Sequence, residues 1–428
     1  MSASRLPRLL AGMGENGSAM TLSEHLAVHG PMNTPTGSKF VAAVEESGLR
    51  GRGGAGFPTG RKLASVAGAR SLRGTVVMAN GVEGEPASSK DRLLLSAKPH
   101  LVLDGIAAAA AAVGARRALL CVHEDALLSS RLGQAMAERK AAGIDALAVE
   151  LVTVPSSYVS SEESALVSWV NGGRPLPTTR PPRPDERGVD GRPTLINNVE
   201  TFAHMALIAR HGPSWFAETG TRSEPGTTLL TVSGAVAAGG VLEVETGTPL
   251  GDVLSLCGGL TEPVSGYLVG GYFGGWLPPS VTGTLALSPS AVQAAGGALG
   301  AGVIIAFPAS ACPLAETGRV LGWLAGESAG QCGPCRFGLP AISQSFDLLT
   351  RGSLSRSGRA ALHRWIDQVT GRGACRHPDG TARFVASALS VFKAEIDLHA
   401  RGRCCAPRQR AKVCPLPERP ADRLVASS

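Results

Sequence analysis

The sequence predicts an α/β domain built on a parallel sheet, followed by a small α+β domain and a helical bundle. Apolar strand-like runs alternate with helical segments between residues 75 and 154, short strand-like runs cover the glycine-rich region 225–300, and helical periodicity continues from residue 314. Alternating strands and helices with short connections are typical of parallel sheets covered by helices. The expected divisions are 1–35 (loosely ordered), 36–215 (α/β), 225–300 (α+β), 310–400 (helical) and 401–428 (basic tail).

The α/β region carries the clearest alternation. Helices are expected at 38–48, 99–113, 126–142 and roughly 198–211, and strands at 75–79, 118–123 and 147–154. Ligands of such sheets bind at the carboxyl ends of the strands. The segments 80–91 and 156–163, which follow the first and third strands, are therefore candidates for a binding site.

The two later regions differ from it in periodicity. In 225–300 we expect strands at 227–233, 241–246 and 266–271 and a helix at 250–257. Beyond residue 314 the periodicity predicts helices at 314–326, 334–350, 357–370 and 380–399. Helices joined by short turns are typical of a small bundle.

Composition limits the classes of protein. The chain has 428 residues, is 43% hydrophobic and carries a formal net charge of +7. It lacks an apolar run of the ~20 residues that a spanning helix needs, so we expect a cytoplasmic protein without membrane insertion. Residues 351–428 hold fifteen Lys/Arg and six Asp/Glu but no nucleic-acid motif, so nucleic acid is not an expected partner. An acidic protein partner and a solvated tail are both compatible with this charge.

Cysteines cluster near the end of the chain. Six of the nine follow residue 330, among them a C-x-x-C pair, Cys332 and Cys335, with Cys375 in a later glycine-rich turn. This spacing suits an iron–sulfur cluster, which usually needs four thiolates. Zinc and a dithiol redox pair are the alternatives. Cys121 and Cys257 lie in apolar segments and are expected to be buried thiols without a chemical role.

A glycine-rich loop follows the first helix. Residues 51–56 match G-x-G-x-x-G, but a helical pattern precedes them, whereas the dinucleotide fingerprint follows a strand. Exposed backbone N–H groups beside Arg52, Arg61 and Lys62 suit a phosphate or a flat cofactor. A flexible loop with solvated basic residues is the alternative.

Acids and amides gather at the expected strand ends. Glu83 and Glu85 follow the first strand, and Glu162 and Glu163 follow the third. Carboxylates at such positions bind ribose or nicotinamide groups in dinucleotide sites. Helix capping is the alternative, by Ser160 or Ser161 before the acids and by an amide at 197–198.

Five motifs, in order, resemble one known family. They are S-G-L-R-G-R-G-G-A-G-F-P-T-G at 47–60, N-x-x-E-G-E-P at 80–86 with Lys90-Asp91, Y-x-x-x-E-E-S-A-L at 158–166, P-T-x-x-N-N-V-E-T at 193–201 and E-S-x-G-Q-C-x-P-C-R at 327–336. The chain resembles, over roughly residues 20–400, the NADH- and FMN-binding subunit of respiratory complex I and the diaphorase subunits of NAD-linked hydrogenases and formate dehydrogenases. The resemblance implies a flavin-binding α/β domain, a ubiquitin-like β-grasp domain of SLBB type and a bundle holding a [4Fe-4S] cluster.

The resemblance also implies roles for individual residues. FMN would be held by Gly51, Arg52, Gly53, Lys62, Asn80, Glu83, Glu162, Asn197, Asn198 and Thr201. Phe57 would stack on the nicotinamide side, and Glu85 and Glu163 would contact NADH as catalytic residues. Hydride would pass from NAD(P)H to FMN, and single electrons would pass to the cluster and on to a redox partner with a ferredoxin-like or thioredoxin-like fold.

Several positions depart from the family pattern. Val82 stands where the family has an aspartate, and Ser161 replaces a glycine that lies against the flavin. Ser65 and Arg183 replace two aromatic residues beside NADH, and Arg180 replaces a lysine. Arg180 and Arg183 are expected to bind the dinucleotide phosphates, and they raise the hypothesis of a preference for NADPH.

The cluster motif departs most. Ala329 stands where the fourth cysteine belongs, so Cys332, Cys335 and Cys375 supply only three of the ligands. A fourth ligand from Cys312, Cys404, Cys405, Cys414 or Ser328, a three-ligated cluster and no cluster all fit the sequence. A non-catalytic scaffold subunit and a thiol-redox or zinc protein are the alternatives to a diaphorase-type enzyme.

Overall fold

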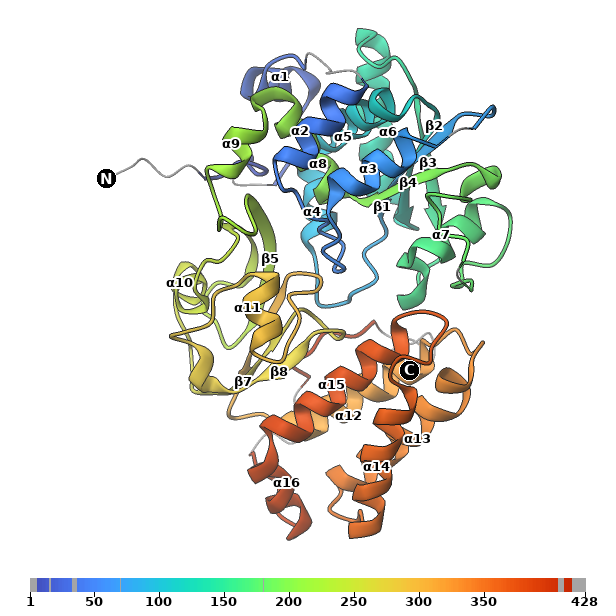
Figure 1. Ribbon diagram of the computed structural model, residues 1–428. Coiled ribbons are helices and arrows are strands. Elements are labelled where there is room, and N and C mark those ends of the chain that lie inside the picture. The colour runs from blue at the N-terminus through green and yellow to red at the C-terminus, as the bar shows by residue number, and fades with distance from the viewer. Residues whose placement is uncertain are drawn as a thin grey trace, which may run out of the picture.

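The computed structural model describes residues 6–14, 17–32, 37–69, 71–179, 181–406 and 412–417. The helix-covered first sheet, a second sheet and a helical bundle follow one another along the chain. In Figure 1 the first sheet and its helices lie at the top, the second sheet at lower left and the bundle at the bottom. The predicted fold class is confirmed.

The first sheet is fully parallel, with strand order β3-β2-β1-β4. Its strands are β1 (Thr75–Gly81), β2 (Ala115–His123), β3 (Val149–Val154) and β4 (Thr194–Asn198). The first three confirm the expected strands. Strand β4 was not predicted, because five residues between a proline and a helix show no measurable alternation.

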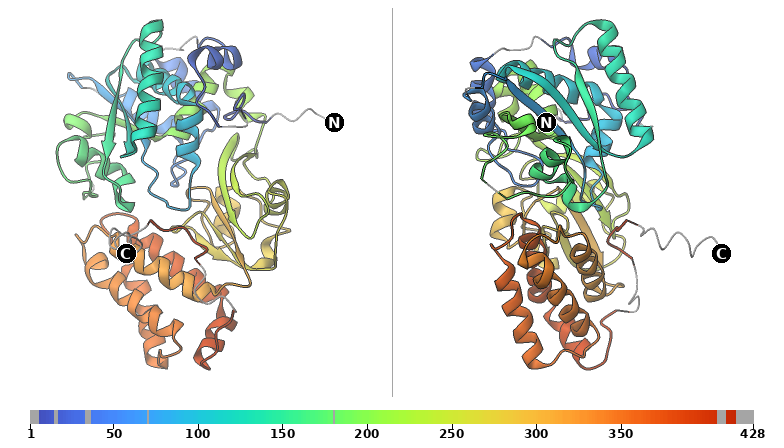
Figure 2. Two further views of the ribbon diagram at one scale, coloured as in Figure 1. Left: turned by 180° about the vertical axis from the view of Figure 1, so that it is seen from behind. Right: turned by 90° about the vertical axis from the view of Figure 1, so that its right-hand side faces the viewer.

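Helices cover both faces of this sheet (Figure 2). They are α1 (Leu22–His29), α2 (Ser38–Glu46), α3 (Thr59–Ala67), α4 (Lys90–Ala97), α5 (Pro99–Val113), α6 (Ala126–Ala142), α7 (Glu163–Val170), α8 (Val199–His211) and α9 (Pro213–Ala217). Val77 and Ala79 of β1 face the larger core with α5 and α8. Val76 and Met78 face the smaller core with α7, as the two-residue strand period requires.

The second sheet has strand order β6-β5-β9-β7-β8. Its elements are β5 (Thr227–Gly234), β6 (Gly240–Glu245), α10 (Leu250–Leu256), β7 (Val264–Val269), β8 (Gly275–Leu277), α11 (Pro289–Ala294) and β9 (Val303–Pro308). The central strand β9 lies beyond residue 300, where this domain was expected to end. It pairs parallel with β5 and antiparallel with β7, so the domain needs it to close its sheet.

The bundle comprises α12 (Pro313–Gly326), a π-helical turn (Pro334–Gly338), α13 (Leu339–Thr350), α14 (Arg356–Val369), α15 (His377–Val391) and α16 (Lys393–Ala400). The single helix expected at 380–399 is two helices. The break falls at Phe392, whose fully buried ring lies 5.1 Å from the ring of Trp276 in the second sheet.

The end of the chain is not solvated throughout, as one interpretation of the basic tail expected. Residues 412–417 pack on the bundle, where Cys414 is 1% exposed. The backbone N–H groups of Val413 and Cys414 donate to Glu316 Oε2 at 3.1 and 2.9 Å, and the hydroxyl of Tyr272 donates to the carbonyl of Pro415.

No single helix in the described part of the chain is both long and apolar enough to cross a bilayer. Helices α4 and α5 pass that test only as a pair, and they are bent by 94° at their junction.

The packing of α5 on α8 gives a first prediction. A Cβ added at Gly105 would lie 1.8 Å from the carbonyl oxygen of Phe202, and backbone cannot yield as a flexible side chain can. We expect Gly105→Ala to lower the free energy of unfolding by about 3 kcal/mol or to prevent folding. The measurement is thermal unfolding followed by circular dichroism.

Gly133→Ala is the matched control, because Gly133 is an exposed glycine within α6 with nothing near its added Cβ. Alanine there should stabilise by up to about 1 kcal/mol. Equal stability of the two variants would contradict the close helix contact.

Candidate functional site

The carboxyl ends of β1 and β4 bring three predicted amides together. Asn80 pairs in register with Asn198, and Ala79 pairs with Asn197. The Asn80 side chain donates to the carbonyl of Ser161 at 2.8 Å and accepts from the N–H of Val82. Asn198 caps α8 through the N–H of Glu200, as the capping alternative expected. Two of the three amides therefore already hold the strand ends in place.

Asn197 differs from the other two amides. Its side-chain Nδ2 is buried and has no hydrogen-bond partner among the described residues. Such buried donors are rare in folded proteins and call for an acceptor. An acceptor atom on the rim of a flavin ring would supply what this amide lacks, so the site fits the implied cofactor.

The glycine loop meets this edge of the sheet. The backbone N–H of Arg52 donates to the hydroxyl of Thr201 at 2.9 Å, and a Cβ added to Gly53 would lie 3.3 Å from the Cβ of Asn198. Gly54 has a φ of +102°, which side chains rarely allow. A cavity of about 370 Å³ opens beside the loop, lined by Gly51, Arg52, Gly54, Lys90, Gly300 and Arg383 among others.

The Arg52 guanidinium contacts the second domain and the start of α8. It is buried, donates to the carbonyl of Thr227 at 2.9 Å and lies 3.9 Å from Glu200. Arg52 therefore contributes its backbone to the loop and uses its charge to hold the second domain against the first.

A buried ion network supports the loop from below. Lys90 Nζ donates to Asp91 and Glu200 at 2.7 Å each, and Asn198 Nδ2 donates to Asp91 at 2.6 Å. The lysine offsets the burial of Glu200, and the pKa of Glu200 falls to about 2. No role was predicted for Lys90, Asp91 or Glu200, although all three lie within the motifs noted in the sequence.

The two acids after β1 have different surroundings. Glu83 accepts from the N–H groups of Asp91 and Arg92 at 3.1 Å and so caps the start of α4. Glu85 accepts from the Tyr158 hydroxyl at 3.1 Å and from the Tyr272 N–H at 2.7 Å. Glu85 thus joins the first domain to the second, whereas Glu83 is held within the first.

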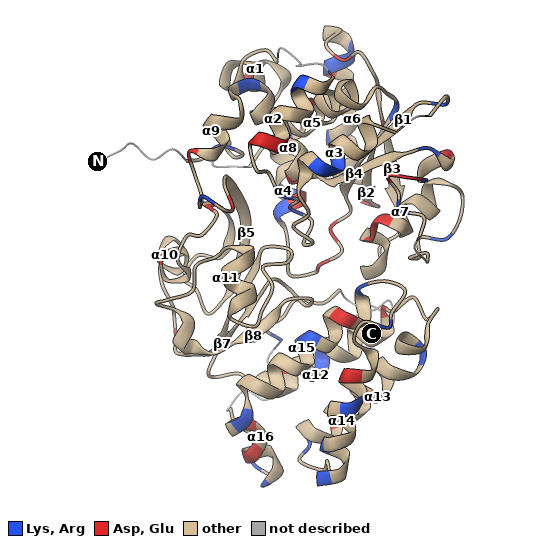
Figure 3. Cartoon of the chain, in the orientation of Figure 1, with Lys and Arg blue, Asp and Glu red and all other residues tan. Residues whose placement is uncertain are grey.

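The acids after β3 directly follow Ser161, whose carbonyl accepts from Asn80 at 2.8 Å. Glu162 caps α7 through the N–H groups of Ser164 and Ala165, so the expected serine cap is wrong. Glu163 forms an ion pair with Lys62 of α3, and both side chains are partly exposed. Figure 3 shows acidic positions on the loop after β1 and at α7, where the α/β domain faces the bundle.

The remaining predicted positions that the structure describes differ in exposure. The Phe57 side chain is 50% exposed on the glycine loop, which leaves a ring face available. Ser65 donates to Asp185 at 2.8 Å, close in sequence to the exposed Arg183. Arg180 lies outside the described residues. Val82 is buried with Met78, and the Ser161 hydroxyl donates to the carbonyl of Tyr158.

The three cluster cysteines meet at one end of the bundle. The sulfur of Cys332 accepts from the N–H groups of Ala374 and Cys335, and the pKa of Cys332 is lowered although burial opposes this. Burial raises the pKa of Cys335 to about 12, and the charge of Cys332 adds to the effect. Burial raises the pKa of the Cys375 thiol and the nearby Glu162 carboxylate adds to this, so the predicted cluster ligands adjoin the predicted flavin residues.

The other four cysteine candidates for the fourth ligand lie elsewhere. The three cluster cysteines lie near the end of α12, because His377, two residues after Cys375, donates through Nε2 to the carbonyl of Leu324 in the last turn of that helix. Cys312 caps the first turn of α12, which has 14 residues and is therefore about 20 Å long. Cys404 and Cys405 gather round Cys312, and the backbone of Cys414 binds Glu316 near the same end. The structure therefore contradicts all four of these candidates.

Family models match three parts of the chain. The Nuo51 FMN-binding domain matches residues 44–207, the SLBB domain matches 229–270, and the iron–sulfur binding region of NADH-ubiquinone oxidoreductase-F matches 315–399. The first region holds the glycine loop, the second covers most of β5 together with β6 and β7, and the third holds Cys332, Cys335 and Cys375.

Curated relatives are similar to this chain in sequence along most of its length. The F subunit of the NADH-quinone oxidoreductase of Streptomyces coelicolor is 33% identical over 381 residues, which cover 86% of this chain and 84% of that one. The corresponding F 2 subunit of Rhizobium meliloti is 30% identical, covering 86% and 90%. The NADP-reducing hydrogenase subunit HndC of Solidesulfovibrio fructosivorans is 29% identical, covering 87% and 78%.

A solved structure has the same fold. A chain of the NAD⁺-reducing [NiFe]-hydrogenase in its H₂-reduced state superposes with a TM-score of 0.76 at 28% identity over 91% of this chain, which spans 65% of that longer chain. These relatives are subunits of multisubunit assemblies. The chain belongs to the family of NADH-quinone oxidoreductase F subunits, flavoproteins of NADH dehydrogenase type with an FMN-binding domain, an SLBB domain and an iron–sulfur region.

Proposed function

We propose that this chain oxidises a reduced nicotinamide dinucleotide at the edge of its first sheet and delivers electrons through Cys332, Cys335 and Cys375 to a partner protein. The observation that carries the proposal is the unpartnered amide of Asn197 at the carboxyl end of β4, beside the glycine loop. FMN held there would supply the hydride-accepting and single-electron chemistry.

In this reaction the protein would hold and orient the flavin and the dinucleotide. Gly51 and Gly53 with the backbone of Arg52 form one wall, supported by Thr201. Asn80, Glu83, Asn198 and Glu162 fix the strand ends and helix starts around it, and Asn197 supplies a free donor. Lys62 and Glu163 form an ion pair between α3 and α7. A dinucleotide bound beside Glu163 would contact this pair.

The dinucleotide would enter by the exposed ring of Phe57 and the carboxylates of Glu85 and Glu163. Arg183 is exposed, and with Arg180 it would attract the phosphates. HndC carries the description NADP-reducing, which supports testing NADPH beside NADH. If Arg183 contacts a 2′-phosphate, Arg183→Ala lowers the ratio of NADPH to NADH activity.

Electrons would leave the site through the bundle. Cys375 lies close enough to Glu162 for their charges to interact, so the cysteines adjoin the acid that caps α7. Three thiolates with Ser328 or solvent as the fourth ligand would complete the iron site. A ferredoxin-like or thioredoxin-like subunit is the partner whose fold suits single-electron uptake.

The direct test is an absorbance spectrum of anaerobically purified protein before and after NADH is added. Flavin bands and a broad iron–sulfur shoulder that both bleach are expected. A colourless protein would overturn the proposal.

The Asn197 amide gives a prediction about flavin affinity. Asn197→Ala should weaken FMN binding about two- to twelvefold, since one neutral hydrogen bond contributes about 0.5–1.5 kcal/mol. Apoprotein stability should change little, because Nδ2 has no partner to lose among the described residues. Fluorescence titration with FMN measures the affinity.

Asn171→Ala is the control, because Asn171 makes its hydrogen bonds to Gly188 and Asp190 outside this site. Equal FMN affinities in both variants would show that the donor of Asn197 has another purpose.

The cysteines give a prediction about iron. Cys375→Ser should remove most of the iron and the cluster absorbance, because only two of the three gathered thiolates remain. Cys404→Ser should keep its iron, since Cys404 is exposed and lies at the other end of α12. Iron analysis after anaerobic purification distinguishes them, and loss of iron from Cys404→Ser alone would contradict the assignment.

Glu85 makes stability depend on pH. Burial raises the pKa of Glu85 to about 7 from an ordinary value of 4.5. The folded protein then holds a proton that the unfolded chain releases between those values, so stability falls as pH rises through that window and is constant above it. The fall amounts to at most about 3 kcal/mol.

Glu85→Gln should therefore lose less stability than the wild type between pH 5 and pH 8. Some dependence remains, because burial and the nearby Asp91 also raise the pKa of Glu83 to about 7. Thermal unfolding at both pH values measures this difference. Exposed Glu46→Gln should keep the full wild-type dependence, and an unchanged dependence in Glu85→Gln would count against a protonated Glu85.

A further inference from the structure

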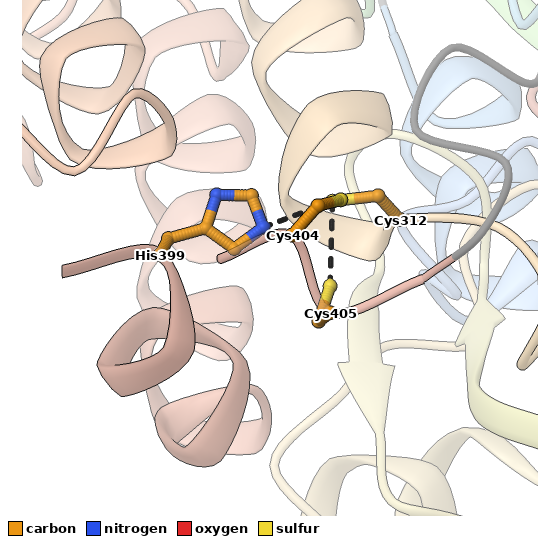
Figure 4. A group of neighbouring side chains, drawn as sticks. All are labelled: Cys312, His399, Cys404 and Cys405. Atoms are coloured by element: carbon orange, nitrogen blue, oxygen red, sulfur yellow. Dashed lines mark hydrogen bonds between the residues drawn. The ribbon is translucent and has the colours of Figure 1, made fainter. Parts of the chain in front are cut away.

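Three cysteines and a histidine converge at the end of the bundle away from the predicted cluster. Cys312 precedes α12, His399 lies in the last turn of α16, and Cys404 and Cys405 follow that helix. Their ligand atoms all lie within 4.8 Å of one another. Figure 4 shows the side chains of His399 and Cys405 directed at the sulfur of Cys312.

The distances suit a single tetrahedral ion. Cys312 Sγ lies 3.4 Å from Cys405 Sγ and 3.5 Å from His399 Nε2. Two sulfurs bound to one zinc at about 2.3 Å stand roughly 3.8 Å apart in a tetrahedron. Ligands of a cubane cluster each bind a different iron and so spread further apart, and a disulfide would bring two sulfurs to about 2.05 Å.

The histidine is independently set up as a ligand. His399 Nδ1 lies in hydrogen-bond contact with the carbonyl of Thr350, which can only accept. Nδ1 must therefore carry a proton, so Nε2 of the neutral ring presents its lone pair toward Cys312. Metal-binding histidines are oriented by this kind of second hydrogen bond. His399 is only 4% exposed, so the surrounding structure holds its ring in this orientation.

The start of α12 positions the sulfur of Cys312. Its sulfur accepts from the N–H of Ala315 at 3.4 Å while Cys312 caps α12. Backbone donors and the positive end of a helix dipole stabilise a thiolate. Cys312 is 1% exposed, whereas Cys404 is exposed, so an ion could enter from the side of Cys404.

We propose that Cys312, His399, Cys404 and Cys405 bind one structural Zn²⁺ ion. The site lies beyond the proposed electron path, at the opposite end of α12 from Cys332, and it takes no part in the redox reaction. It would join the start of α12 to the end of α16 and to the chain that follows. That chain returns at residues 412–417 to dock on Glu316 and Tyr272.

The test measures zinc and iron in the purified full-length protein by mass spectrometry of the metals. About one zinc per chain is expected in the wild type. The zinc content of the double variant Cys404→Ser/Cys405→Ser should fall at least about tenfold, and its iron content should stay the same. Cys375→Ser is the matched control, which should keep its zinc and lose iron. The two metals thus report the two sites separately.

X-ray absorption at the zinc edge supplies the second measurement, which does not depend on a variant that folds. Three sulfurs at about 2.3 Å and one nitrogen at about 2.0 Å are expected. In His399→Ala, a water oxygen should take the place of the nitrogen ligand of zinc, or the zinc content should fall.

Three results would overturn the proposal. The first is wild-type protein without zinc, and two fewer free thiols in its denatured chain would then identify a disulfide in place of the ion. The second is iron that disappears from the double variant, which would make this the cluster site. The third is zinc that remains in the double variant but is lost from Cys375→Ser.

Discussion

The rest of the structure depends on the buried contacts that the Glu200 carboxylate makes with Lys90, Leu229 and Arg52. One oxygen accepts from Lys90 at 2.7 Å, and the other accepts from the backbone N–H of Leu229 at 2.9 Å and faces Arg52 at 3.9 Å. The side chain is fully buried. Loss of one partner would leave an unpaired charge inside the protein, at a cost of about 3–5 kcal/mol.

This carboxylate also explains how three separate regions form one site. Lys90 belongs to α4, Arg52 to the glycine loop and Leu229 to the second sheet, so all three are fixed to the start of α8. Asn198, two residues earlier, ends β4 and holds Asp91. The glycine loop therefore keeps its position because its arginine is anchored inside the protein. Its backbone is left to face the cavity.

Much of the fold follows from local patterns in the sequence. Helices α5 and α6 have the predicted bounds, because an apolar periodicity over 15 or more residues is hard to misread. Strands β4 and β9 were missed because their identity depends on neighbours far away in the sequence. Glu200 shows the same limit, since nothing local to a helical glutamate predicts that it is buried against Lys90.

The cysteines show where sequence spacing stops being informative. Cys332 and Cys335 are recognisable because their ligand spacing is local, and family resemblance adds Cys375. Cys312 and His399 are separated by 87 positions and meet only because α16 returns to the start of α12. From spacing alone, Cys312, Cys404 and Cys405 could therefore be counted only as spare ligands for the cluster.

The position of α12 gives these two groups different surroundings and different tasks. The carbonyl of Leu324 in its last turn accepts a hydrogen bond from His377, which is close to Cys375 in the sequence. Burial raises the pKa of Cys375, and the Glu162 carboxylate of the first domain adds to that rise. Its first turn holds Glu316, which fixes the returning chain at Cys414. A redox centre must lie near its electron donor, whereas a structural ion belongs where chain ends must be held together. One helix thus separates the thiols that would carry electrons from those that would hold the fold.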